Sequence, residues 1–155
     1  MPNWCSNTLT ISGDAKQIKE FKTISKDGKG QEKTDLSFNK TVPIPDMIDP
    51  SKDVSMSDKP NKMLKKLFGA DNWYDWHIKN WGTKGDASNA ELTMDDDEYL
   101  EYIFETAWSP PVEWLEKVSK KFPKLEFRMK YEEEGMGFIG IAKGSNGNIE
   151  DKWID

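Results

Sequence analysis

The chain has 155 residues, the size of one ordinary domain, and a formal charge of −6 that disfavours non-specific binding to DNA or anionic lipid. Only 35% of the residues are apolar, but 12% are aromatic, so a few large side chains must build the core of a folded protein. The single Cys5 excludes an internal disulfide, and no apolar run approaches the roughly 20 residues of a membrane span. We therefore expect a cytoplasmic protein that does not associate with membranes.

The first part of the chain predicts a β-α-β start. Apolar and polar residues alternate over 4–12, which is typical of a strand. Asp14 then caps a predicted helix with apolar residues at helical spacing up to Ile24. The polar segment 25–34 indicates a loop, and 35–42 (DLSFNKTV) predicts a second strand.

The middle segment, 43–86, reads as an irregular insertion that carries short helices. Its prolines, serines and charges argue against regular structure at the start, and one short helix is predicted to end at Gly69. A second helix follows, with Asp71 as its cap and Gly82 at its end. Three of the seven tryptophans and the only histidine lie in this helix and just after it.

The last part of the chain predicts strands with one helix between them. Alternation over 88–94 and 100–108 indicates a strand pair joined by the acidic turn 95–98. Ser109 is the expected cap of a helix begun by the following prolines. Further strands are predicted at 124–131 and 137–144, and the tail after 147 is expected to be an edge strand or a surface segment.

Together these elements predict one α+β domain over 1–155. Its expected architecture is a ferredoxin-like antiparallel sheet with helices on one face and a helical, Trp-rich insertion at about 43–86.

Four motifs carry a resemblance to a known family: MPNWCSNTLTISG, WGTKGD, TAWSPP and YEEEGMGFIG, in this order. The chain resembles the YubB-type ferredoxin-like family of phages, plasmids and genomic islands over nearly its whole length. The resemblance implies the ferredoxin-like fold and a mobile-element setting, and it implies no reaction, because the family is uncharacterised. Gly85 stands where a tryptophan is common in that family.

The indole-rich segment is the first candidate site. Trp73, Trp76, His77 and Trp81 could form an aromatic platform for a nucleobase or a partner protein. Tryptophans on a short helix more often attach that helix to the rest of the fold, and we favour this packing interpretation. The basic residues around these rings leave binding of single-stranded nucleic acid open as a second hypothesis.

The evidence for an enzyme is weaker. A pocket lined by His77, Lys84 and Asp86 would be needed, and His77 lacks the second histidine or nearby cysteine of a metal site. Ser109 lacks the glycine pattern of a nucleophile elbow, and the acidic runs at 95–98 and 132–134 lack the spacing of a calcium loop.

We therefore predict a non-enzymatic binding or regulatory module of mobile-element origin, with no cofactor and no metal. The expected partner is a host protein, with single-stranded nucleic acid as the second choice and an enzyme using a small molecule or nucleotide as the third. The predicted binding surface is the insertion from 60 to 86 against the sheet edge, with these residues: Trp73, Trp76, His77, Trp81, Lys84, Asp86 and Trp108.

Overall fold

A computed structural model describes residues 3–28, 33–53, 55 and 61–155 of the chain. Within these ranges the elements follow each other as β1 (Trp4–Gly13), α1 (Ala15–Ser25), α2 (Phe38–Thr41), the 3-10 turn η1 (Asp46–Ile48), α3 (Lys62–Phe68), α4 (Trp73–Asn80), β2 (Ser88–Asp96), β3 (Tyr99–Ala107), α5 (Val112–Lys121), β4 (Leu125–Glu133), β5 (Phe138–Ser145) and β6 (Asn148–Ile154).

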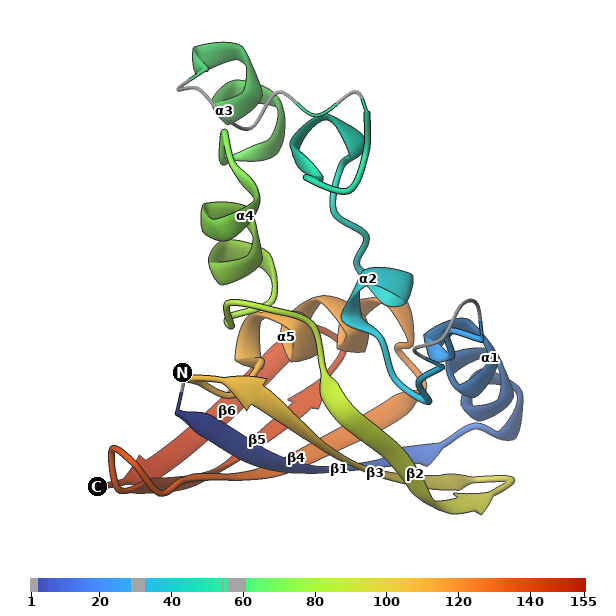
Figure 1. Cartoon of the computed structure of the whole chain (residues 1–155). Helices are drawn as coiled ribbons and strands as arrows, with labels where there is room; N and C mark the ends of the chain where they lie inside the picture. Colours follow the sequence, from blue (N-terminus) through green and yellow to red (C-terminus); the bar gives the residue numbers. More distant parts are fainter. Residues whose placement is uncertain (1–2, 29–32, 54, 56–60) are drawn as a thin grey trace.

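The described strands form one antiparallel sheet with the order β2-β3-β1-β4-β5-β6. The first four of them, with α1 and α5 as connections, have the arrangement of a ferredoxin-like domain. Two hairpins then add β5 and β6 beyond β4. The predicted α+β class, with its antiparallel sheet and helices on one face, is confirmed (Figure 1).

The core lies between the sheet and the helices. Alternation along β1 and β4 turns one set of side chains, such as Leu9 and Phe127, under α1 and α5, where they are fully or almost fully buried. From the helices, Phe21 packs edge-on against Phe127 at a ring distance of 5.8 Å, and Trp114 is completely buried. Removal of these aromatic rings from water supplies much of the driving force for folding.

The predicted strand at 35–42 is wrong. The segment forms the single-turn helix α2. Between α1 and α2, the described residues form only an isolated β-bridge, between Asp27 and Thr34. The carboxylate of Asp86 accepts hydrogen bonds from the backbone N–H groups of Phe38 and Asn39 at 2.6 and 3.2 Å, and these bonds stabilise the start of a helix. Consequently the insertion includes α2 as well, and the second strand of the sheet is β2.

Two predicted caps are also wrong. The Ser109 hydroxyl donates to the Gly82 carbonyl at 2.6 Å and does not cap α5, whose N-cap residue is Pro111. Helix α4 is capped by Asn72, which accepts from the Asp75 N–H at 2.8 Å. Asp71 instead accepts from the Asn61 N–H at 3.1 Å and so joins the start of α3 to the start of α4.

The insertion forms a lobe on the helix-covered side of the sheet, and α3 and α4 project away from it above α5 (Figure 1). The opposite face of the sheet is left uncovered by the described elements (Figure 1). None of the helices that the structure describes is long and apolar enough to cross a membrane.

Candidate functional site

The Trp-rich helix is packed into the fold. Trp76 and Trp81 are 5% and 2% exposed, and the indole N–H of Trp81 donates to the Val42 carbonyl at 2.9 Å. The Trp81 ring lies 4.1 Å from the His77 ring in a stacked arrangement and 5.9 Å from Phe38. Neither buried indole has a free face on which a base could stack, whereas Trp73 at the start of α4 is half-buried.

His77 is fixed in place by a hydrogen bond from its ring. Its Nδ1 lies 2.8 Å from the Lys84 carbonyl, which only accepts, so Nδ1 carries the proton. Burial lowers the pKa of His77, and the coulombic effects of Asp86 and Asp49 partly oppose this. The ring therefore joins α4 to the loop that follows it.

Asp86 has a structural environment as well. Its carboxylate accepts from the Ser37 hydroxyl at 2.7 Å and from the Ala87 N–H at 2.7 Å, in addition to the two α2 amides. Burial raises the pKa of Asp86, and these donors oppose the increase. The structure thus brings His77, Lys84 and Asp86 into one loop region, but it uses the imidazole and the carboxylate to hold the loop and α2 in place.

Trp108 differs from the other tryptophans of the predicted site. It is 48% exposed, and its backbone has φ +73°, an unfavourable conformation for a large side chain. The backbone N–H of Trp108 donates to the Asn3 carbonyl at 2.8 Å. The residue after Asn3 is Trp4, which is 43% exposed. Trp108 therefore lies just beyond β3 as part of an exposed corner, and its role in binding stays a prediction.

The four sequence motifs meet at one end of the sheet. Cys5 lies opposite both Thr106 and Glu133 in the strand register. On the helix-covered side, the Thr83 hydroxyl donates to the Ala107 carbonyl at 3.0 Å. The motifs thus form the joint between β1, β3, β4 and the insertion. Burial raises the pKa of the Cys5 thiol to about 12, so this cysteine is unreactive.

The open face of the sheet carries the other set of alternating side chains. They form three rows that run across β1, β4, β5 and β6, and the rows are named here by position. The end row is Ser6, Glu132, Ile139 and Ile154; the middle row is Thr8, Lys130, Ile141 and Lys152; the third row is Thr10, Arg128, Lys143 and Glu150.

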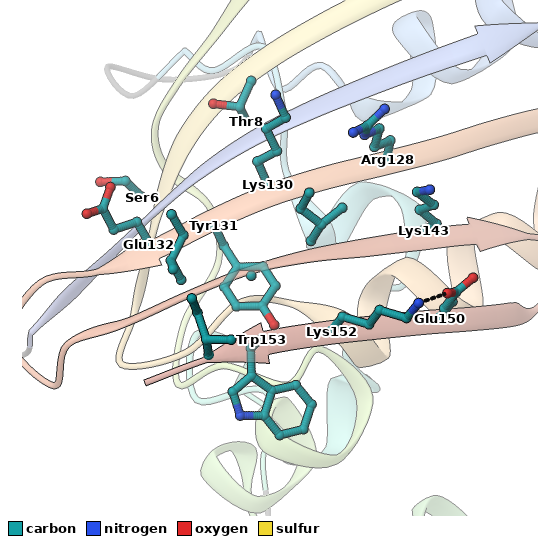
Figure 2. A pocket seen from close by; sticks show the side chains of 14 residues that line it. Ser6, Thr8, Arg128, Lys130, Tyr131, Glu132, Lys143, Glu150, Lys152 and Trp153 are labelled. Carbon is teal, nitrogen blue, oxygen red and sulfur yellow. Dashed lines mark ion pairs between the residues drawn. The ribbon is translucent and has the colours of Figure 1, made fainter.

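All residues of these rows except Thr10 line an open hollow of about 620 Å³ (Figure 2). Its lining includes the cations Arg128, Lys130, Lys143 and Lys152. Ile139 and Ile154 are 50% and 70% exposed at its end, so charged and apolar surface lie side by side. A hollow with this lining is suited to hold a ligand that is both anionic and apolar.

The charges on this face are only partly compensated. Lys152 pairs with Glu150 at 2.9 Å, an interaction that raises the pKa of Lys152 and lowers that of Glu150. Among the described residues, no ion pair is formed by Arg128, Lys130 or Lys143. Moreover, Arg128 and Lys143 lie directly opposite each other on neighbouring strands, and like charges in that position destabilise a sheet. On its other side, Lys143 lies opposite Glu150 of β6, which compensates part of its charge.

This face was missed in the sequence analysis. Alternation in the segment KLEFRMKY already turns Arg128 and Lys130 away from the core. The missing information was the register, which sets these two cations beside Lys143 and Lys152. Metal binding gains no support, since the described His, Cys, Asp and Glu side chains form no cluster that could hold an ion.

Comparisons with known proteins agree with the fold. Residues 87–155 match the family described as "Ferredoxin-like domain in Api92-like protein". The crystal structure of protein Api92 from Yersinia pseudotuberculosis is similar over 100% of this chain and 99% of that one, with a TM-score of 0.64 and 12% sequence identity. No curated protein matches the chain.

The ferredoxin-like part of the family prediction is therefore confirmed, and the matched part of the chain covers β2 to β6 with α5. At 12% identity, the likeness to Api92 describes the fold alone. The YubB-type assignment and the mobile-element setting stay predictions.

Proposed function

We propose that this protein is a non-enzymatic binding module that holds a partner protein on the open face of its sheet. This proposal keeps the predicted class of partner, a host protein, and moves the binding surface from the insertion to β1, β4, β5 and β6. The mobile-element setting is part of the proposal and rests on the motif resemblance alone.

The observation that carries the proposal is the hollow on the open face. Exposed isoleucines surround it together with Arg128, Lys130 and Lys143, which form no ion pair with the residues that the structure describes, and no described element covers this side of the sheet. Exposed apolar groups next to charged ones are typical of a protein interface with an apolar centre and a polar rim. On the helix-covered side the apolar side chains are buried, and the indole N–H groups of Trp81 and Trp114 both have acceptors.

Single-stranded nucleic acid fits this face less well. Bases need exposed aromatic rings to stack on, and none of the three rows contains one. Trp153, which is 60% exposed, also lines the hollow, but it alternates with Lys152 and Ile154 along β6, so its ring points to the other side of the sheet. The neighbouring strand β3 places Glu101 opposite Thr10 and Glu105 opposite Ser6, where both carboxylates repel a phosphate backbone. A protein surface does not require stacking rings and therefore fits better.

An enzyme reading has less support. The imidazole of His77 lies on the helix-covered side and donates to the Lys84 carbonyl, while Asp86 accepts from the start of α2. These bonds engage the Asp86 carboxylate and the Nδ1 of His77 with backbone groups, and neither residue lines the hollow on the open face.

Capture from the host cell tests the proposal. The tagged chain should recover a specific protein, and replacing both exposed isoleucines, Ile139→Ser and Ile154→Ser, should abolish the recovery. The matched control replaces two similarly exposed apolar residues of α3, Met63→Ser and Leu67→Ser, which are 67% and 60% exposed. Recovery of the same protein by the sheet variant, or its loss only from the α3 variant, would contradict the proposal.

A further inference from the structure

We infer that the open face binds an extended acidic segment of the partner, with the pattern apolar-x-acidic-x-acidic. The inference rests on the proposed function and adds the chemistry of the bound segment. Its acidic side chains would lie over the middle and third rows, and its apolar side chain would lie over the end row.

The first argument is the repulsion built into the empty face. Arg128 and Lys143 lie directly opposite each other, and Lys130 follows Arg128 two residues along the same side of β4. Each of these side chains is exposed and has no ion pair among the described residues (Figure 2). Carboxylates of a bound segment would convert this repulsion into charge-assisted hydrogen bonds, which are among the stronger protein contacts.

The second argument is the spacing of the rows. Successive rows are two residues apart along each strand. An extended segment also points every second side chain to the same side, so its period is the same. A segment lying along the strands thus presents every second side chain to one row. On β5 and β6 the end row holds Ile139 and Ile154, and each of the next two rows holds two cations. The matching sequence is therefore apolar, then acidic, then acidic.

The third argument limits the length of the negative segment. Glu132 lies in the end row, and Glu126 lies two residues before Arg128 on the same side of β4. On the far side of β1, Glu101 and Glu105 face outward as well. A long polyanion such as nucleic acid would extend beyond the cations and be repelled by these carboxylates. Two acidic residues are short enough to contact the cations alone.

The test is a chemical-shift titration of the whole ¹⁵N-labelled protein with short peptides. The probe is GSISESEGS, and its matched controls are GSISQSQGS, without charge, and GSSSESEGS, without the apolar side chain. We expect shifts centred on the amides of Lys130, Lys143 and Lys152, with affinity about tenfold lower for the glutamine peptide. The variant with Arg128→Glu and Lys143→Glu should lose the shifts, and its control with Lys65→Glu and Lys66→Glu should keep them.

Equal shifts with the glutamine peptide would overturn the acidic pattern and leave the face itself as a binding surface. Absence of shifts with GSISESEGS at millimolar concentration would also overturn it, as would shifts confined to α3. A lower Kd for a short oligothymidylate on the same rows would overturn the assignment to an acidic peptide and show nucleic acid to be the better ligand. Loss of partner capture is measured separately with the isoleucine variants, so a failure of this inference is distinct from a failure of the proposed function.

Discussion

The helix-covered and open faces of the sheet are built from alternate residues of the same strands, and they differ in what their side chains contact. Under the helices, the Trp114 indole N–H donates to the Thr41 hydroxyl at 2.8 Å and its ring packs 4.7 Å from Phe38. On the open face, Arg128 and Lys143 oppose each other without ion-pair partners among the described residues. The buried tryptophans Trp76, Trp81 and Trp114 therefore stabilise the fold, while less prominent alternating residues form the surface available to a partner.

The largest expected effect comes from removing a ring of the covered face. Trp114→Ala should lower the free energy of unfolding by about 3–5 kcal/mol, because it leaves a large cavity and removes the donor to Thr41. Urea denaturation measures the change. Trp153→Ala is the matched control, since this tryptophan is 60% exposed and its loss should change stability by less than about 1 kcal/mol. Similar losses at both positions would remove the contrast between buried and exposed tryptophans.

The backbone of the exposed Trp108, just beyond β3, gives a second prediction. Trp108 has φ +73°, where glycine is unstrained and other residues are disfavoured by about 1–2 kcal/mol. Trp108→Gly should therefore be more stable than Trp108→Ala by about 1 kcal/mol, because both variants lose the same ring. Thermal and chemical denaturation of the pair measure the difference. Equal stability would mean that the backbone at this position relaxes once the ring is gone.

The structural role of His77 predicts a pH effect. Its pKa is lowered in the folded state by burial, so the unfolded chain binds the proton more readily. The stability contributed by His77 is thus fully present above the unfolded pKa of about 6.5 and is lost as the pH falls through the lower folded pKa. Denaturation at pH 7.5 and pH 5 should give a smaller pH-dependent loss for His77→Phe than for the wild type. The same loss in both proteins would argue against a neutral, packed imidazole.

Much of the fold follows from local sequence patterns. Alternation predicts β1 and β4, and helical spacing predicts α1 and α5, because each element buries one set of side chains. The error at 35–42 arises from a distant partner: Asp86, 48 residues away from Phe38, supplies the acceptor that makes α2 a helix. The predicted cap by Ser109 is wrong for a similar reason, because the acceptor of its hydroxyl, the Gly82 carbonyl, lies 27 residues earlier in the chain.

The candidate surface is less accessible to sequence reasoning. The outward direction of Arg128 and Lys130 follows from alternation within β4 alone. Their grouping with Lys143 and Lys152 depends on the register of three strands, which no single segment encodes. In the same way, the burial of Trp81 depends on Val42 and Phe38, which belong to another part of the insertion.

One substitution, Arg128→Glu, should change the free energy of unfolding and the capture of the partner in opposite directions. The new carboxylate would face Lys143, so the free protein should become more stable by about 0.2–1 kcal/mol, while capture of the partner from the host cell should be lost. Arg128→Gln, which removes the charge without reversing it, should lie between the variant and the wild type in both measurements. A less stable Arg128→Glu protein that still captures the partner would contradict the view that the open face keeps unpaired cations for an acidic ligand.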